Sequence, residues 1–87
     1  MANHPSALKR HRQSLKRADR NSAIRTNVRN SIKKLRALVE AGDKPAAQLQ
    51  LREVEKKIQK ASTKGVYHAN AASRRVSRLT RAVGGLD

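Results

Sequence analysis

Apolar side chains recur every three or four residues in three segments of this chain, and glycine or proline stands between the segments. A spacing of three and four residues places side chains on one face of an α-helix. A β-strand would need sustained alternation of apolar and polar residues, which the sequence lacks. The three stripes are Ile24, Val28, Ile32, Leu35 and Val39; then Ala47, Leu51, Val54, Ile58 and Ala61; then Ala69, Ala72, Val76, Leu79 and Val83. The pattern predicts an all-α fold of three helices.

Residues that start and stop helices stand at the ends of these segments. We expect the first helix over about residues 6–41, with Gly42 ending it. Asp43 is the expected N-cap of the second helix, with Pro45 in its first turn. Gly65 is expected just past the end of that helix, and the third helix is expected over about residues 67–83. The connections are short, so neighbouring helices should pack antiparallel.

The first predicted helix is too long for its partners. At 1.5 Å per residue it would span about 50 Å, against about 25–30 Å for each of the other two. Continued backwards from Ile24, its apolar stripe meets Asn21, Arg17, Ser14 and Arg10. The sequence therefore predicts a basic N-terminal arm over residues 1–21 and one domain, a three-helix antiparallel bundle, over residues 22–87. Like charges destabilise a free helix, so we expect this arm to be disordered alone and helical on a polyanion.

Positive charge dominates the chain and is unevenly spread. The 87 residues hold 21 Lys and Arg against 6 Asp and Glu, a formal net charge of +15. Residues 1–36 hold eleven cations and one acid, a net +10, and residues 62–87 hold five cations and one acid, a net +4. Between them, residues 37–61 hold five cations and four acids, a net +1. A domain this basic attracts polyanions, so nucleic acid is the leading partner class and an anionic membrane surface is the second.

Several classes of protein and site are excluded or disfavoured by what the composition lacks. Tyr67 is the single aromatic residue and there is no Cys, which excludes a base-stacking platform and a Cys-based zinc finger. Gly42 and Pro45 interrupt the repeat that a leucine zipper would need. No apolar run approaches the roughly 18 residues of a membrane span, and the first residues lack the apolar core of a signal peptide. The acids and histidines follow no catalytic or metal-binding spacing, so we expect no enzyme activity, cofactor, metal or small-molecule substrate.

Phosphate contact through Lys and Arg on helices remains as the mode of binding. In the third helix Asn70, Arg74, Ser77 and Arg81 recur at helical spacing, and Arg75 and Arg78 flank them. Solvated faces usually mix signs, but no acid occurs between Glu55 and Asp87. This favours an RNA-facing stripe over an ordinary solvated one. Near the start of this helix, His68 is either a phosphate contact or a residue that caps or packs.

Two alternatives to RNA binding come from the same features. A basic tail on a small helical module is also typical of a histone-like or nucleoid-type DNA-binding protein. A basic amphipathic helix lying on a membrane is a second alternative. It is disfavoured because Arg10, Ser14 and Arg17 interrupt the apolar face that such a helix needs.

The run from Lys64 to Arg74, KGVYHANAASR, carries a family resemblance. It resembles the Lys-Gly-x-x-His-x-Asn-x-Ala-x-Arg signature of the bacterial small-subunit ribosomal protein S-twenty family. Further landmarks agree in order and spacing, so that the resemblance covers essentially the whole chain: Ala2-Asn3, Ser6-Ala7, Lys9-Arg10, Arg12, Ile32-Lys33-Lys34 and Glu40-Ala41-Gly42-Asp43-Lys44. Ala69, Ala71 and Val76 stand where the family often has basic residues, which leaves Ala72, Leu79 and Val83 as the firmer core positions.

The resemblance implies a structural constituent of the ribosome. Such a protein would be a three-helix bundle that binds 16S ribosomal RNA early in assembly, as a monomer in the cytoplasmic small subunit, and stabilises the RNA fold. It implies that Lys9, Arg10, Arg12, Lys16 and Arg17 line the embedded arm. It also implies a second contact around the turn into the third helix, made by Lys64, His68, Asn70 and Arg74.

Together, the charge pattern and the resemblance predict one set of RNA-binding residues. The set is Lys9, Arg10, Arg12, Lys16, Arg17, Arg20, Arg25, Arg29, Lys33, Lys34, Lys64, His68, Asn70, Arg74, Arg75, Arg78 and Arg81.

Overall fold

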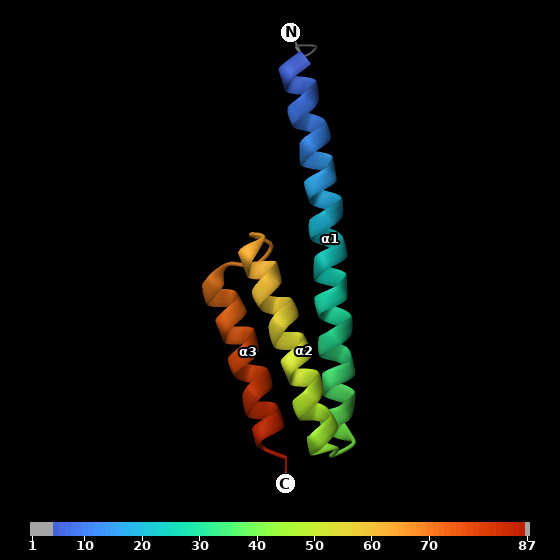
Figure 1. Cartoon of the computed structure of the whole chain (residues 1–87), viewed down its shortest axis with the longest axis vertical. Helices are drawn as coiled ribbons and strands as arrows, with labels where there is room; N and C mark the ends of the chain where they lie inside the picture. Colours follow the sequence, from blue (N-terminus) through green and yellow to red (C-terminus); the bar gives the residue numbers. More distant parts are fainter. Residues whose placement is uncertain (1–4, 87) are drawn as a thin grey trace.

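The computed structural model describes residues 5–86, which form three α-helices: α1 (Pro5–Glu40), α2 (Lys44–Thr63) and α3 (Ala69–Gly84). Consecutive helices run antiparallel, and α2 lies between the other two (Figure 1). Both α1 and α3 pack against α2 and make few contacts with each other. The all-α arrangement of three helices with a long first helix is confirmed. The landmark Ala2-Asn3 and the first four residues of the predicted arm lie outside the described residues.

Glycine with a positive φ ends each of the first two helices. Gly42 has φ 74° and Gly65 has φ 78°, a conformation that residues with a Cβ rarely adopt. The Gly42 amide donates to the Val39 carbonyl at 3.0 Å, and the next amide donates back to the Leu38 carbonyl at 3.2 Å. The same pair of hydrogen bonds recurs at Gly65, so both helices end in a Schellman motif. The chain reverses direction immediately after each motif, which gives the antiparallel packing.

Side chains cap the starts of α2 and α3. Asp43 accepts a hydrogen bond from the Ala46 amide at 3.2 Å, as expected of the predicted N-cap, with Pro45 in the first turn. Nδ1 of His68 accepts from the Asn70 amide at 3.1 Å and caps α3. The third helix therefore begins at Ala69, two residues later than predicted, because His68 has the extended backbone of a cap.

The predicted apolar stripes form the core. Nine of their residues are buried: Val28, Leu35, Ala47, Val54, Ile58, Ala61, Ala72, Leu79 and Val83. Five more pack half-buried against these: Ile24, Ile32, Val39, Leu51 and Val76. The prediction for Ala69 is wrong, since this residue is exposed. It begins α3 beside Ser62 and Thr63, where α2 ends and offers no further surface to cover it.

Two buried residues were not predicted. Val66 is buried in the turn after α2, two residues past the expected helix end. Ser31 is 6% exposed on α1, and its Oγ accepts a hydrogen bond from Lys57 Nζ at 2.7 Å. Gln50 Nε2 also donates to the Ser31 carbonyl, at 3.1 Å. These hydrogen bonds tie α1 to α2 beside the apolar core.

The first half of α1 extends past both other helices (Figure 1). Residues 6–20 are all exposed, and they include Leu8 at 46% and Leu15 at 54%. We call residues 6–20 the arm. The structure gives it in a helical form without core packing, so our expectation that a polyanion stabilises this helix stays a prediction.

Candidate nucleic-acid interface

The cations of the arm share one side of their helix. They are Lys9, Arg10, Arg12, Lys16, Arg17 and Arg20, all of them exposed. At 100° per residue, all six fall within about 160° of the helix circumference. Leu8, Leu15 and Asp19 lie outside this arc, next to its edge at Arg12. The arm therefore presents a continuous basic face, whose long side chains are free to meet a polyanion.

The remaining predicted cations of α1 divide between two directions. Arg25 and Arg29 line a hollow together with Tyr67 and Arg75, which belong to the turn before α3 and to α3 itself. Lys33 and Lys34 are exposed but do not line this hollow. The fold thus brings Arg25 and Arg29 to α3 and leaves the two lysines on other sides of α1.

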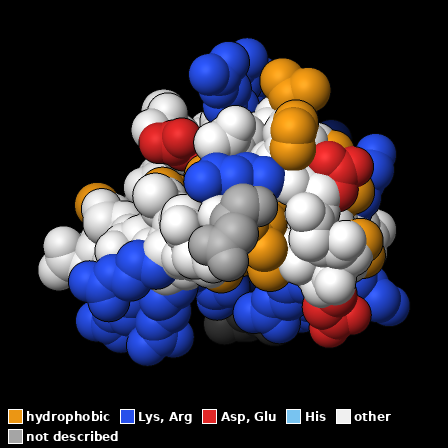
Figure 2. All heavy atoms as spheres, turned by 90° about the horizontal axis from the view of Figure 1, so that it is seen from below, with side chains coloured by type: hydrophobic (Ala, Val, Ile, Leu, Met, Phe, Trp, Pro, Cys, Tyr) orange, Lys and Arg blue, Asp and Glu red, His pale blue; other side chains and the backbone are white. Residues whose placement is uncertain are grey.

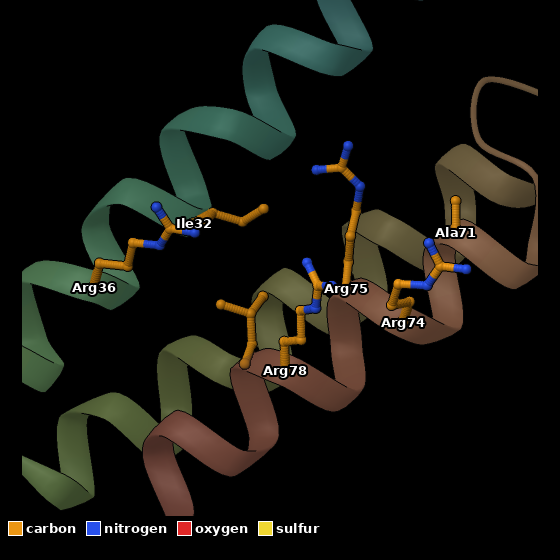
Figure 3. A pocket seen from close by; sticks show the side chains of 7 residues that line it. Ile32, Arg36, Ala71, Arg74, Arg75 and Arg78 are labelled. Carbon is orange, nitrogen blue, oxygen red and sulfur yellow. The ribbon is translucent and has the colours of Figure 1, made fainter.

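Three arginines of α3 face α1. Arg74, Arg75 and Arg78 line a hollow with Ile32 and Arg36 of α1. In Figure 3, Arg75 and Arg78 extend from α3 into the space between the helices, and Ile32 extends into it from α1. Asn70 and Arg81 are exposed and do not line it, so the predicted stripe Asn70, Arg74, Ser77 and Arg81 is divided by the fold.

Three adjoining hollows form one groove between α1 and α3. The hollow that Arg74 lines shares Ile32, Arg36 and Arg75 with the hollow that Tyr67 lines. It shares Arg36, Arg78 and Leu79 with a third hollow, which Leu35, Val39, Glu40 and Ala82 also line. We call this the α1–α3 groove. Its six arginines are Arg25, Arg29, Arg36, Arg74, Arg75 and Arg78. The groove exists because α1 and α3 both pack on α2 and hardly on each other.

Arg36 is the groove residue that the sequence prediction missed. It lines all three hollows and is exposed. A signal was present, because Arg25, Arg29, Ile32 and Arg36 recur at spacings of four, three and four, on one side of a helix. The sequence does not show that this side of α1 faces α3, so only the tertiary structure identifies Arg36 as part of the groove.

Tyr67 holds one of these arginines in place. The Arg75 guanidinium lies over the Tyr67 ring, 4.8 Å from its centroid. The ring is half-buried against the core, so it offers a fixed face for a cation–π contact. The single aromatic residue of the chain therefore supports a cation and does not present a free face for a base.

The turn into α3 carries a separate group of cations. Lys64 caps the C-terminal end of α2 and lines a shallow hollow with Lys56 and Lys60, which were not in the predicted set. His68 is exposed and caps α3, which supports its structural interpretation and leaves its outer edge accessible. The described residues therefore hold cations at the arm, in the groove and at this turn.

Charge is unevenly distributed around the bundle as well. Seen from the end that carries the C-terminus, Lys and Arg side chains gather most densely at the lower left (Figure 2). Carboxylates lie singly elsewhere on this view. Between residues 5 and 86, no group of three or more His, Asp or Glu could hold a metal ion, and no helix is long and apolar enough to cross a membrane.

Comparison with known proteins gives the family. A family model described as Ribosomal protein S20 matches residues 2–84. The small ribosomal subunit protein bS20 of Maridesulfovibrio salexigens is 54% identical over 83 residues, which are 95% of this chain and 95% of that protein. The bS20 of Oleidesulfovibrio alaskensis is 49% identical over 87 residues, all of both chains. The bS20 of Nitratidesulfovibrio vulgaris is 52% identical over 83 residues, 95% of each chain. The chain therefore belongs to the ribosomal protein S20 family, the S-twenty family that its sequence resembles.

Proposed function

We propose that this protein binds 16S ribosomal RNA directly, in the small subunit of cytoplasmic ribosomes, and stabilises the RNA fold during assembly. Its family membership makes it a structural constituent of the ribosome and a non-enzymatic protein, as predicted. The relatives offer no support for the alternative of a histone-like DNA-binding protein. RNA as the direct partner, and a single copy in the assembly, are our proposal.

The arm is the observation that carries this proposal. The arm is an exposed helix with six cations on one face and a single acid, so packing within its own protein contributes little to its stability. Phosphates neutralise such a face, and phosphate contacts position a protein without reading base sequence. The predicted division into an arm at residues 1–21 and a bundle at residues 22–87 is part of the proposal, with the arm reaching into RNA and the bundle resting on its surface.

A salt titration tests the proposal. We would measure the affinity of the full chain for 16S ribosomal RNA and for duplex DNA of equal length between about 50 and 500 mM salt. If all six arm cations contact phosphates, the arm alone contributes about 5 to the slope of log affinity against log salt. Both polymers should therefore show steep slopes.

The RNA should still bind more tightly than the DNA at about 150 mM salt, because a folded RNA matches the shape of the cationic surface and a uniform duplex does not. Equal affinity for both polymers at that salt would overturn the proposal and favour the DNA-compacting alternative.

A further inference from the structure

The α1–α3 groove holds many like charges close together, and these charges do not stabilise the fold. Six arginines line it, and the two hollows around Ile32 and Arg75 include no acid among their lining residues. Glu40 is the single acid of the groove lining, at the end near the turn into α2. Like charges held together raise the energy of the folded state, so an anion in the groove would relieve this repulsion.

The arrangement of the arginines suits a row of phosphates. Arg25, Arg29 and Arg36 lie along one wall, and the first and last of them are about 16 Å apart along the helix axis. Arg74, Arg75 and Arg78 form the other wall. That length is enough to meet several consecutive phosphates of one nucleic-acid strand. Each guanidinium has the planar fork of donors that binds a phosphate through two hydrogen bonds.

The floor of the groove favours a backbone over a small ligand or a base. Ile32 and Leu79 lie between the two walls and give the sugars an apolar surface. The central hollow, of about 290 Å³, continues into the two adjoining hollows as an open groove, whereas a small-molecule pocket encloses most of its ligand. Arg75 covers the Tyr67 ring, so no aromatic face in the groove is free for stacking.

We infer that the α1–α3 groove holds a single sugar–phosphate strand of the RNA between Arg36 and Arg75, and that Tyr67 is the positioning residue for Arg75. The inference rests on the proposed function, since it names where and how the RNA strand lies. The bases of this strand point away from the protein, and the contact is independent of base sequence.

Arg36→Gln tests the groove against a matched control, Arg52→Gln. Both arginines are exposed on a helix, neither was predicted as a contact, and Arg52 on α2 does not line the groove. Loss of one phosphate contact lowers the salt slope by about 0.9 and the affinity at 150 mM salt by about fivefold. We expect this for Arg36→Gln on 16S ribosomal RNA, and a change under about twofold for Arg52→Gln.

A double-mutant cycle tests the role of Tyr67. Tyr67→Phe keeps the ring under Arg75 and should bind RNA as the wild type does. Tyr67→Leu should weaken binding by a few-fold and have no further effect when Arg75→Gln is already present, because the ring acts through that arginine. Additive losses from Tyr67→Leu and Arg75→Gln would show that Tyr67 does not position Arg75.

The outcomes separate this inference from the proposed function. A wild-type protein that does not prefer 16S ribosomal RNA over duplex DNA would overturn the proposed function itself. A wild-type protein that prefers the RNA, with Arg36→Gln and Arg52→Gln equal in affinity and slope, would overturn the groove inference alone. That second result is also the one expected if an acidic protein segment, and not RNA, occupies the groove.

Discussion

The two halves of α1 share one helix and one basic character but differ in what surrounds them. In residues 24–39 the stripe that includes Val28 and Leu35 is buried against α2. In the arm every residue is exposed, including Leu8 and Leu15. The difference arises because α2, with 20 residues, covers only about 30 Å of a helix about 54 Å long. The core thus ends where the partner helix ends, and the helix itself continues.

The arginines of the two halves also differ in what they face. Arg25 and Arg29 in the bundle half are placed opposite α3 and line a groove. Arg10 and Arg17 in the arm occupy the positions that would be apolar if the core continued. Their charge therefore replaces a core face with the exposed basic face that we propose binds RNA. Mutations of the arm cations should affect binding alone, and mutations of the buried stripe in the bundle half should affect folding.

Charge reversal in the arm should give the largest effect. Arg10→Glu combined with Arg17→Glu removes two phosphate contacts and adds two repulsions. At 150 mM salt we expect the affinity for 16S ribosomal RNA to fall about 100-fold, with the salt slope reduced by about 2. Filter binding measures both quantities, and circular dichroism of the free protein should show a melting temperature within about 2 °C of the wild type.

The matched control for charge reversal is Arg52→Glu with Lys56→Glu, at two exposed positions of α2 outside the predicted set. It makes the same change in net charge and should weaken RNA binding much less. If both double variants lost affinity equally, net charge would explain the binding and the arm would have no special role.

A pair of leucine substitutions in the same helix should give the next largest effect, on stability. Leu35 is fully buried and Leu15 is 54% exposed. Leu35→Ala should lower the free energy of unfolding by about 3 kcal/mol, since it removes buried methyl groups and leaves a cavity. Leu15→Ala should change it by less than about 0.5 kcal/mol. Urea denaturation followed by circular dichroism measures both, and equal losses would contradict the division of α1 into two halves.

Substitutions of His68 should give the smallest effects and separate its two interpretations. His68→Ala removes the cap on the Asn70 amide and should destabilise the bundle by about 1 kcal/mol. His68→Asn supplies a good N-cap and should restore stability to within about 0.5 kcal/mol. If His68 also contacts a phosphate, both variants should bind 16S ribosomal RNA about threefold more weakly. Wild-type affinity in His68→Asn would leave capping as the only role of His68.

Much of the fold could be predicted because its signals are local. The spacing of apolar residues, the glycines at positions 42 and 65 and the cap at Asp43 act within a few residues of the chain, and all were confirmed. Ala69 was misassigned because its burial depends on where α2 ends, which is not a property of the third helix. Ser31 lies at helical spacing between Val28 and Leu35, but its burial depends on Lys57 from α2.

Most residues of the candidate interface could be chosen from the sequence, but the sequence does not show which of them the fold brings together. The sequence identified the cations of the arm, and the structure gives them as one exposed basic face. Arg36 was missed because the sequence shows its position relative to the core stripe of its own helix and not which neighbour it faces. Similarly, the predicted stripe of the third helix was divided, because α3 turns Arg74 and Arg78 toward α1 and leaves Asn70 and Arg81 outside the groove.

The sequence by itself determined three helices, the glycines that end the first two, a first helix longer than its partners, and a family. Each of these depends on interactions between residues a few positions apart, or on motifs read along the chain. Only the tertiary structure decided that α1 and α3 leave a groove lined by arginines from both helices and supported by Tyr67. The physical reason is that helical periodicity fixes the side of a helix on which a residue lies, whereas packing on α2 fixes what that side meets.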